Sequence, residues 1–290
     1  MRGNMAELLS FADENGFAVP AFNYSDCWEM EGIVAAAVQQ RSPVIIATNA
    51  QVAKTHDVRY LAAQANAIAD MVDIPVVNHL DHCTDVEICK AAIRSGYQSV
   101  MLDFSAHDIE ENIEACREVV EYAADFGVAV EAELGRIKGN NEEGCFNSED
   151  FLVDVSTAVR FVNAVNITSL AVGIGNAHGF YTETPKLRFD RLNEVNQAVS
   201  VPLVLHGGTG IPIEDIQKAI GLGINKVNVG THIHNTYLKT LDDIMKNDAQ
   251  RTNIVNIMIR VKESVMADVA VHINMCMAQG QADKFLARTI

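Results

Sequence analysis

The stretch Val76-Val77-Asn78-His79-Leu80-Asp81-His82 begins like a buried β-strand after Pro75 and ends in three ionisable side chains. In a parallel α/β fold, binding and catalytic residues gather at the carboxyl ends of the strands, so this composition indicates that the strand ends in a site. Alternation places His79 and Asp81 on one face and leaves His82 at the strand exit. The alternative is a hydrogen-bonded core histidine at position 79, followed by an Asp–His pair in a surface loop.

The rest of the chain repeats this arrangement, in which an apolar strand alternates with a helical pattern. The eight strand candidates are Phe17–Phe22, Val44–Thr48, Ile74–Leu80, Ser99–Leu102, Val128–Ala132, Ser169–Ile174, Pro202–Leu205 and Lys226–Val229. Eight strands with intervening helices predict a (β/α)8 TIM barrel of the α/β class, for which ~250 residues are typical. An open doubly wound sheet is the alternative, but no Gly-x-Gly-x-x-Gly follows the first strand.

Helical segments are also expected outside the repeating pattern. Met5–Asn15 precedes the first strand and is expected to close the base of the barrel, and two helical stretches, about Thr231–Lys246 and Thr252–Met277, follow the last strand. The second has an apolar stripe from Ile254 to Ile273 that needs a partner, either the barrel wall or another subunit. We therefore expect a homodimer or homotetramer. Residues 1–290 show no internal repeat and are expected to form a single domain, in which Gly135–Ser148 is the expected mobile loop.

The composition narrows the classes of function. A net charge of −16 argues against nucleic acid as a partner, and an anionic substrate must be attracted by a local site. No apolar run reaches ~18 residues, so no membrane span is predicted. The N-terminus lacks the apolar core of a signal peptide. The six scattered cysteines form no Cys-x-x-Cys pair, which indicates free thiols in a reducing cytoplasm.

Polar side chains stand just past the predicted strands, where a barrel builds its site. They are Asn23, Asn49, Asp81, His82, Asp103, Glu133, His178, His206 and Asn228. The imidazoles of His82, His178 and His206 come from three strands and can converge over the barrel mouth, as in a catalytic zinc site with an open fourth position. Such ligand sets have no spacing signature, so this inference depends on the strand assignment, and three histidines without a metal remain the alternative.

Two glycine-rich segments leave the last two strands. His206-Gly207-Gly208-Thr209-Gly210 follows strand seven, and Asn228-Val229-Gly230-Thr231 follows strand eight and opens a helix. Glycine lets backbone N–H groups surround an anion, and the ends of strands seven and eight are the usual phosphate site of a barrel. The alternative is two ordinary glycine-rich turns.

These residues lie in blocks that resemble the class II, metal-dependent ketose-bisphosphate aldolases, a family that includes the fructose- and tagatose-bisphosphate aldolases. The blocks appear in family order and cover nearly the whole barrel. They are Val19–Asn23, His79–His82, Ser99–Asp103, Val130–Gly135, Ala171–Gly179, Leu203–Gly210 and Lys226–Thr231. The His-Leu-Asp-His and Leu-His-Gly-Gly blocks are the most specific.

The resemblance implies a lyase that cleaves or forms the C3–C4 bond of a phosphorylated ketose, with dihydroxyacetone phosphate and an aldehyde as products. It implies that His82, His178 and His206 hold Zn²⁺, that Asp81 is the acid/base at the C4 hydroxyl, and that Glu133 is the active-loop carboxylate. The residues implied for the dihydroxyacetone phosphate part are Asn23, Gly179, Gly207, Gly208, Thr209, Asn228 and Thr231. A monovalent cation, Na⁺ or K⁺, often assists this phosphate site in the family.

The chemistry agrees with the residues. Cleavage leaves an enediolate, whose charge a metal stabilises as a Lewis acid, and a carboxylate must take the C4 hydroxyl proton. The other aldolase solution is a lysine Schiff base. No predicted strand end offers a lysine, and Lys226 begins its strand, which would place it at the opposite end of the barrel.

Several positions depart from the family pattern, so the resemblance does not identify the aldehyde product. They are Asn49, Cys83, the loop after Glu133, Gly230, His232 and Lys262, the last near a frequent arginine for the distal phosphate. One alternative is therefore an aldolase that acts on a substrate with a different carbon chain, such as a deoxy-sugar acid phosphate. A non-catalytic sugar-phosphate-binding barrel is a further alternative, which the three histidines and Asp81 disfavour.

Overall fold

The structure, a computed structural model, describes residues 1–135, 137, 151–179, 185–247 and 252–288. Its eight parallel strands pair in sequence order and β8 pairs with β1, so the sheet closes into the predicted barrel. The strands are β1 (Val19–Asn23), β2 (Val44–Asn49), β3 (Val76–Cys83), β4 (Ser99–Leu102), β5 (Ala129–Leu134), β6 (Ser169–Val172), β7 (Leu203–Leu205) and β8 (Ile224–Val229). The predicted mobile loop lies almost wholly outside the described residues.

Five strands extend beyond the predicted limits: β1 and β2 each gain one residue, Asn23 and Asn49, and β3, β5 and β8 gain two or three. The longer extensions change the placement of three chemically important residues. His82 lies inside β3 and Glu133 inside β5, so neither stands past its strand as predicted. Lys226 is the third residue of β8 and does not begin it. The parallel ladder joins backbone groups whatever the side chain, so it continues through polar residues, as where Glu133 pairs with Ala171.

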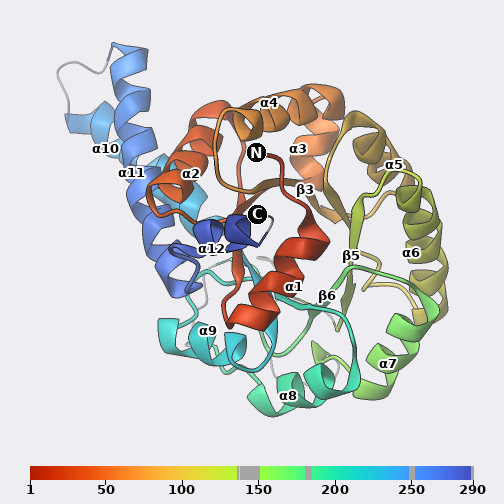
Figure 1. Ribbon diagram of the computed structural model, residues 1–290. Coiled ribbons are helices and arrows are strands. Elements are labelled where there is room, and N and C mark those ends of the chain that lie inside the picture. The colour runs from red at the N-terminus through yellow and green to blue at the C-terminus, as the bar shows by residue number, and fades with distance from the viewer. Residues whose placement is uncertain (136, 138–150, 180–184, 248–251, 289–290) are drawn as a thin grey trace.

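Helices surround the barrel and follow its strands in turn (Figure 1). Those up to β8 are α1 (Met5–Asn15), α2 (Cys27–Gln39), α3 (Ala50–Thr55), α4 (Val58–Asp70), α5 (Val86–Ser95), α6 (Ile109–Ala124), α7 (Val155–Ala164), α8 (Phe189–Ala198) and α9 (Ile213–Ile220). Aspartate begins many of them because its carboxylate accepts first-turn N–H groups that have no helical partner. Asp26, Asp85 and Asp108 do so for α2, α5 and α6.

Helix α1 covers the amino-terminal end of the barrel. It crosses the end of the barrel that faces the viewer in Figure 1, and its apolar face, which includes Leu8, Leu9 and Phe11, is buried. Gly16 ends the helix in the left-handed conformation, which glycine adopts without strain. With this end closed, access to the barrel interior is from the carboxyl ends of the strands.

The chain ends in α10 (Thr231–Asn247), α11 (Ile254–Met275) and α12 (Gln281–Ala287). Helix α11 lies against α2 and α10, and these helices extend from one side of the barrel (Figure 1). The predicted stripe on α11 is mostly covered within the chain: Val265, Val269 and Ile273 join the main core, and Val261 joins a smaller cluster with Ile244.

Of the two predicted partners for this stripe, the chain itself covers most of its length. The exception is Ile254, which is 71% exposed. Close helix packing explains the coverage, because Gly32 of α2 lets the backbones approach: a Cβ there would lie 3.0 Å from Val265 Cγ1. None of the described helices is long and apolar enough to cross a membrane.

Candidate active site

A pocket of about 230 Å³ opens at the carboxyl ends of the strands. Its described lining is Asn23, Asn49, Asp81, His82, His178, Gly179, His206, Gly207, Thr209, Asn228, Gly230, Thr231 and His234. The predicted site residues thus come together in one place, apart from Glu133 and Gly208, which lie outside the lining. His234 is an addition that the sequence patterns did not indicate.

The three predicted zinc ligands form a compact group. One ring nitrogen from each of His82, His178 and His206 lies within 4.8 Å of the other two, and His82 Nε2 is 2.7 Å from His206 Nδ1. Local strand geometry brings His82 into the group. Its φ of 46° is left-handed, and the β3–β4 register shifts between Leu80 and Cys83. This break in alternation lets the consecutive residues Asp81 and His82 both face the pocket.

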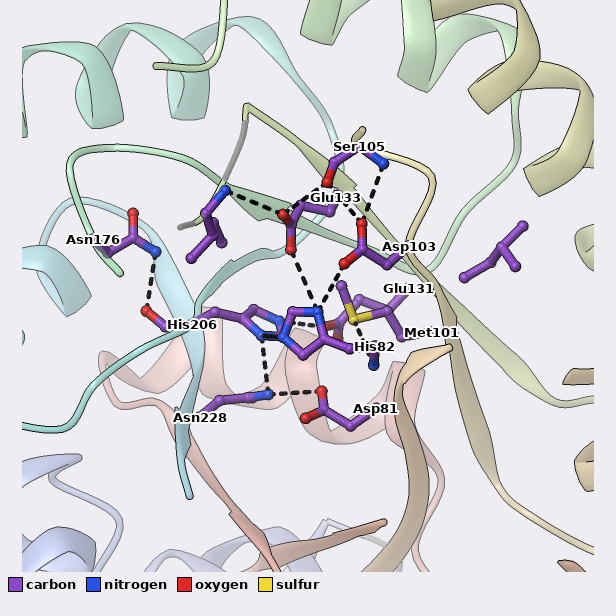
Figure 2. Close-up of polar contacts among 12 residues, drawn as sticks. Asp81, His82, Met101, Asp103, Ser105, Glu131, Glu133, Asn176, His206 and Asn228 are labelled. Carbon is purple, nitrogen blue, oxygen red and sulfur yellow. Dashed lines mark hydrogen bonds and ion pairs between the residues drawn. The ribbon is translucent and has the colours of Figure 1, made fainter. Parts of the chain in front are cut away.

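Carboxylates hold the outer nitrogens of two of these rings (Figure 2). His82 Nδ1 lies 2.9 Å from Asp103 Oδ2, and His206 Nε2 lies 2.9 Å from Glu131 Oε1. An ionised carboxylate only accepts hydrogen bonds, so both outer nitrogens carry protons, and the inner nitrogens are left to share a further proton or to bind a metal. Two facing lone pairs would repel without such a cation between them. Three imidazoles, two of them with a carboxylate behind the ring, are a donor set that fits Zn²⁺.

The ionisation of the histidines is strongly perturbed. Burial opposes charge on His82, but Asp81, Asp103 and Glu133 outweigh it and raise the pKa of His82 to about 10. Burial and the neighbouring imidazoles lower the pKa of His178 to about 3 and lower that of His206 as well. Without a metal the cluster therefore holds a proton on His82, whereas His178 and His206 stay neutral.

A buried ion pair supports the site from below. Both oxygens of Glu131 lie within hydrogen-bonding distance of Lys226 Nζ, at 2.8 and 2.7 Å, and Ser169 Oγ lies 3.2 Å from Oε2. The prediction that Lys226 faces the opposite end is wrong: from the middle of β8 its ammonium reaches the layer beneath His206. Glu131 was not among the predicted site residues, although a charged residue within an apolar strand is a signal of such a role.

Replacing Lys226 by Met should lower the free energy of unfolding by about 3–5 kcal/mol, because Glu131 would remain charged and buried without its main partner. Urea denaturation followed by circular dichroism measures this change. Lys239→Met is the matched control, because Lys239 is exposed on α10 and its loss should change stability by less than about 0.5 kcal/mol. A loss below about 1 kcal/mol in Lys226→Met would contradict the assigned role of the ion pair.

Asp81 is held between two amides at the edge of the pocket. Its Oδ2 accepts a hydrogen bond from Asn23 Nδ2 at 2.8 Å. Its Oδ1 accepts one from Asn228 Nδ2 at 3.0 Å (Figure 2). Burial would raise the pKa of Asp81, but the positive charges of His82 and Lys226 hold it well below its usual range. Asp81 is thus an ionised and oriented base.

Glu133 is in a different state. Its Oε1 accepts hydrogen bonds from Ser105 Oγ at 3.1 Å and Ile137 N at 3.4 Å, while its buried Oε2 has no hydrogen-bond partner among the described residues. Burial and the charge of Asp103 raise the pKa of Glu133 well above its ordinary value. The raised pKa favours the neutral carboxyl form of Glu133, which lies beside His82 and outside the pocket lining.

The predicted phosphate residues form one wall of the pocket. Gly207 has a φ of 66°, and a Cβ there would lie 2.0 Å from Ala177 O, so only glycine fits. Thr231 is the first residue of α10, whose N-terminal amides favour an anion, and Thr209 Oγ1 accepts a hydrogen bond from His232 N at 3.2 Å. Gly208 lies behind this wall, where its N–H bonds Asn228 O.

Comparisons with known proteins agree with this geometry. A family profile described as fructose-bisphosphate aldolase class-II matches residues 3–281. The chain belongs to this class-II aldolase family. A solved structure of the YdjI aldolase from Escherichia coli K12 is 31% identical, with a TM-score of 0.87 over 97% of this chain and 100% of that one. A putative fructose-1,6-biphosphate aldolase from Coccidioides immitis is 33% identical, with a TM-score of 0.85 over 97% and 98%.

A third aldolase shares the fold at lower identity. Fructose-bisphosphate aldolase from Campylobacter jejuni is 20% identical, with a TM-score of 0.83 over 96% of this chain and 97% of that one. The family and these structures show that this class-II aldolase is an enzyme of the lyase class.

The positions where this aldolase departs from the family pattern fall in two groups. Asn49 and Gly230 line the pocket, and Asn49 Oδ1 also caps α3 by accepting from Val52 N. Cys83 and Lys262 lie outside the described lining: Cys83 is buried, and Lys262 Nζ is 3.2 Å from Glu31 Oε2.

Proposed function

We propose that this aldolase is zinc-dependent and cleaves or forms the C3–C4 bond of a phosphorylated ketose, with dihydroxyacetone phosphate and an aldehyde as products. The main supporting observation is the arrangement of one pocket, in which three converging imidazoles lie next to the ionised carboxylate of Asp81. The family supports the class of reaction, and the donor set supports the metal.

Each residue has a proposed role in this reaction. His82, His178 and His206 hold the zinc ion, which when bound supplies a Lewis acid for the negative charge that develops on the substrate oxygens. Asp81 takes the C4 hydroxyl proton as the bond breaks, and Asn23 and Asn228 keep its oxygens oriented through the hydrogen bonds at 2.8 and 3.0 Å.

The remaining roles concern the dihydroxyacetone phosphate half. Glu133 exchanges the proton at C3 after it moves toward the substrate, and Asn23 and Asn228 position this half of the sugar. Backbone amides and hydroxyls on one wall of the pocket bind its phosphate, with Na⁺ or K⁺ as an assisting cation. The proposed phosphate residues are Gly179, Gly207, Gly208, Thr209 and Thr231.

The proposal is tested by metal analysis together with a cleavage screen. Zinc-loaded protein is incubated with bisphosphorylated ketoses and with deoxy-sugar acid phosphates, and released dihydroxyacetone phosphate or other ketone product is measured. Release of dihydroxyacetone phosphate supports the proposal, and release of a different ketone product identifies the alternative substrate class. A protein that binds these sugars and cleaves none of them would be a non-catalytic barrel.

We also propose a homodimer or homotetramer, in which the α10–α11 projection provides the contact. Leu238 and Ile254 are exposed apolar residues on this projection (Figure 1). Sedimentation that shows only monomer at micromolar concentration would contradict this assembly. Four of the five described cysteines are buried and all five are free thiols, which supports our proposal of a reducing, cytoplasmic location.

A further inference from the structure

The charge of the pocket does not match the anionic substrate that we propose for it. Its described lining contains no lysine or arginine, and the whole chain has a net charge of −16. Apart from the three proposed zinc ligands, His234 is the one side chain of that lining able to carry a positive charge. It lies in the first turn of α10, three residues after Thr231.

A buried carboxylate holds this histidine in place. His234 Nδ1 lies 2.7 Å from Oε1 of Glu29, which is on α2 and only 2% exposed. The other oxygen of Glu29 accepts a hydrogen bond from Ser25 N at 2.8 Å, so both oxygens of the carboxylate are engaged. Because Glu29 accepts the Nδ1 proton, Nε2 is the ring nitrogen left for a ligand.

The surroundings of His234 favour its charged form. Burial lowers the pKa of His234, but the hydrogen bond and charge of Glu29, with the charge of Asp26, outweigh this effect and raise the pKa. Asp26 is itself bound by the Tyr237 hydroxyl. The charged groups that face His234 from α2 and from its N-cap are thus both acidic. The imidazolium form of His234 has a second N–H, on Nε2, that it can present to the pocket.

We propose that His234 is a specificity-determining residue, which donates a hydrogen bond from Nε2 to an anionic oxygen of the sugar phosphate and is positioned for this by Glu29. This inference rests on the proposed function and identifies the one cationic side chain of the described lining apart from the proposed zinc ligands. A charge-assisted hydrogen bond of this kind is roughly twice as strong as a neutral one.

Neighbouring cationic groups are committed to other partners. Lys262 Nζ lies 3.2 Å from Glu31 Oε2 and over the Trp28 ring. His232 Nδ1 lies 2.9 Å from Asp268 Oδ2 and is outside the described lining. Of these three side chains, His234 is therefore the one whose position in the pocket lining lets it contact the substrate.

Either half of the substrate can supply the anionic oxygen. The glycine-rich wall that we assign to the dihydroxyacetone phosphate extends from β6 to β8, and His234 follows β8 on α10. Its partner Glu29 is on α2, which follows β1, and Asn23 and Asn49 at the ends of β1 and β2 also line the pocket. The experiment must therefore separate the two halves.

The test is the condensation reaction of the zinc-loaded enzyme, in which dihydroxyacetone phosphate reacts with glyceraldehyde 3-phosphate or with unphosphorylated glyceraldehyde. His234→Gln removes the charge and keeps a polar side chain of similar reach. We expect KM to rise about 10- to 100-fold for the substrate half that His234 binds, with kcat changed less than about threefold. A rise confined to glyceraldehyde 3-phosphate assigns the aldehyde half, and a rise for dihydroxyacetone phosphate with both aldehydes assigns the other half.

The matched control is His107→Gln. His107 forms a similar pair, with Nδ1 at 3.0 Å from Glu111 Oε2, but it lies half-exposed outside the described lining and should leave both KM values unchanged. His234→Lys restores the charge and should recover part of the affinity that His234→Gln loses.

Glu29→Gln gives a second reading that does not depend on His234→Gln folding well. Loss of the Glu29 charge lowers the pKa of His234, so the cation is lost at a lower pH than in the wild type. The ratio of the KM of this variant to the wild-type KM, both measured at the same pH, should rise as the pH increases. On acidification this ratio should approach one.

Two results overturn specific parts of the argument. Unchanged KM values in both His234→Gln and Glu29→Gln would show that the pair only joins α10 to α2. This result would contradict the proposed role of His234 and leave the proposed function of the enzyme intact. A wild-type enzyme that condenses neither aldehyde would instead contradict the proposed function.

Discussion

Replacing Asp81 by Asn should slow C–C cleavage about 10²- to 10⁴-fold, the range that a general base typically contributes, while zinc stays bound. The amide has nearly the shape of the carboxylate, but it has no basic oxygen to accept the C4 hydroxyl proton. It also has only one accepting oxygen, whereas Asp81 accepts from both Asn23 and Asn228. Cleavage rates and zinc content, measured on the same preparation, check this expectation.

Glu133→Gln is the contrasting variant, because it changes a carboxyl group that lies outside the pocket lining. Its proposed task is proton exchange at C3, which can be followed by the loss of tritium from labelled dihydroxyacetone phosphate without any aldehyde. Asp81→Asn should retain much of this exchange, and Glu133→Gln should lose most of it. The opposite pattern would mean that the two carboxyl groups have exchanged roles.

The architecture of the barrel was predictable because its signals are local. Buried parallel strands appear as short apolar runs, and the helices between them show apolar residues at helical spacing. The strand ends were less predictable, because the upper layer of the barrel interior is polar. Hydrophobicity falls at His82 and Glu133, although β3 continues past a register shift to Cys83 and Glu133 pairs with Ala171 in the ladder, so the predicted strands stopped too early.

The candidate site was predictable only as a set of strand ends. The convergence of His82, His178 and His206 follows from closure of the barrel, which brings every strand end to one rim. Their supports were not predictable, because the sequence separations are long and have no fixed spacing. Glu131 is 95 positions from Lys226, and Glu29 is 205 from His234.

Replacing His206 by Ala should remove most of the zinc, of which the wild type should hold about one per chain, and lower activity by at least about 10³-fold. His206 is fully buried, and its Nδ1 faces His82 Nε2 at 2.7 Å, so its loss removes one of the three donors from the interior of the site. The barrel should still fold, because Glu131 keeps its ion pair with Lys226.

Metal analysis and far-ultraviolet circular dichroism on the same sample check both parts of this expectation. His79→Gln is the matched control: His79 is equally buried on β3, but its Nδ1 lies 2.8 Å from Ser99 Oγ and it belongs to none of the metal-binding groups among the described residues. This variant should keep its zinc even if its stability falls. A His206→Ala protein with full zinc occupancy would show that the metal, where present, is held by other residues.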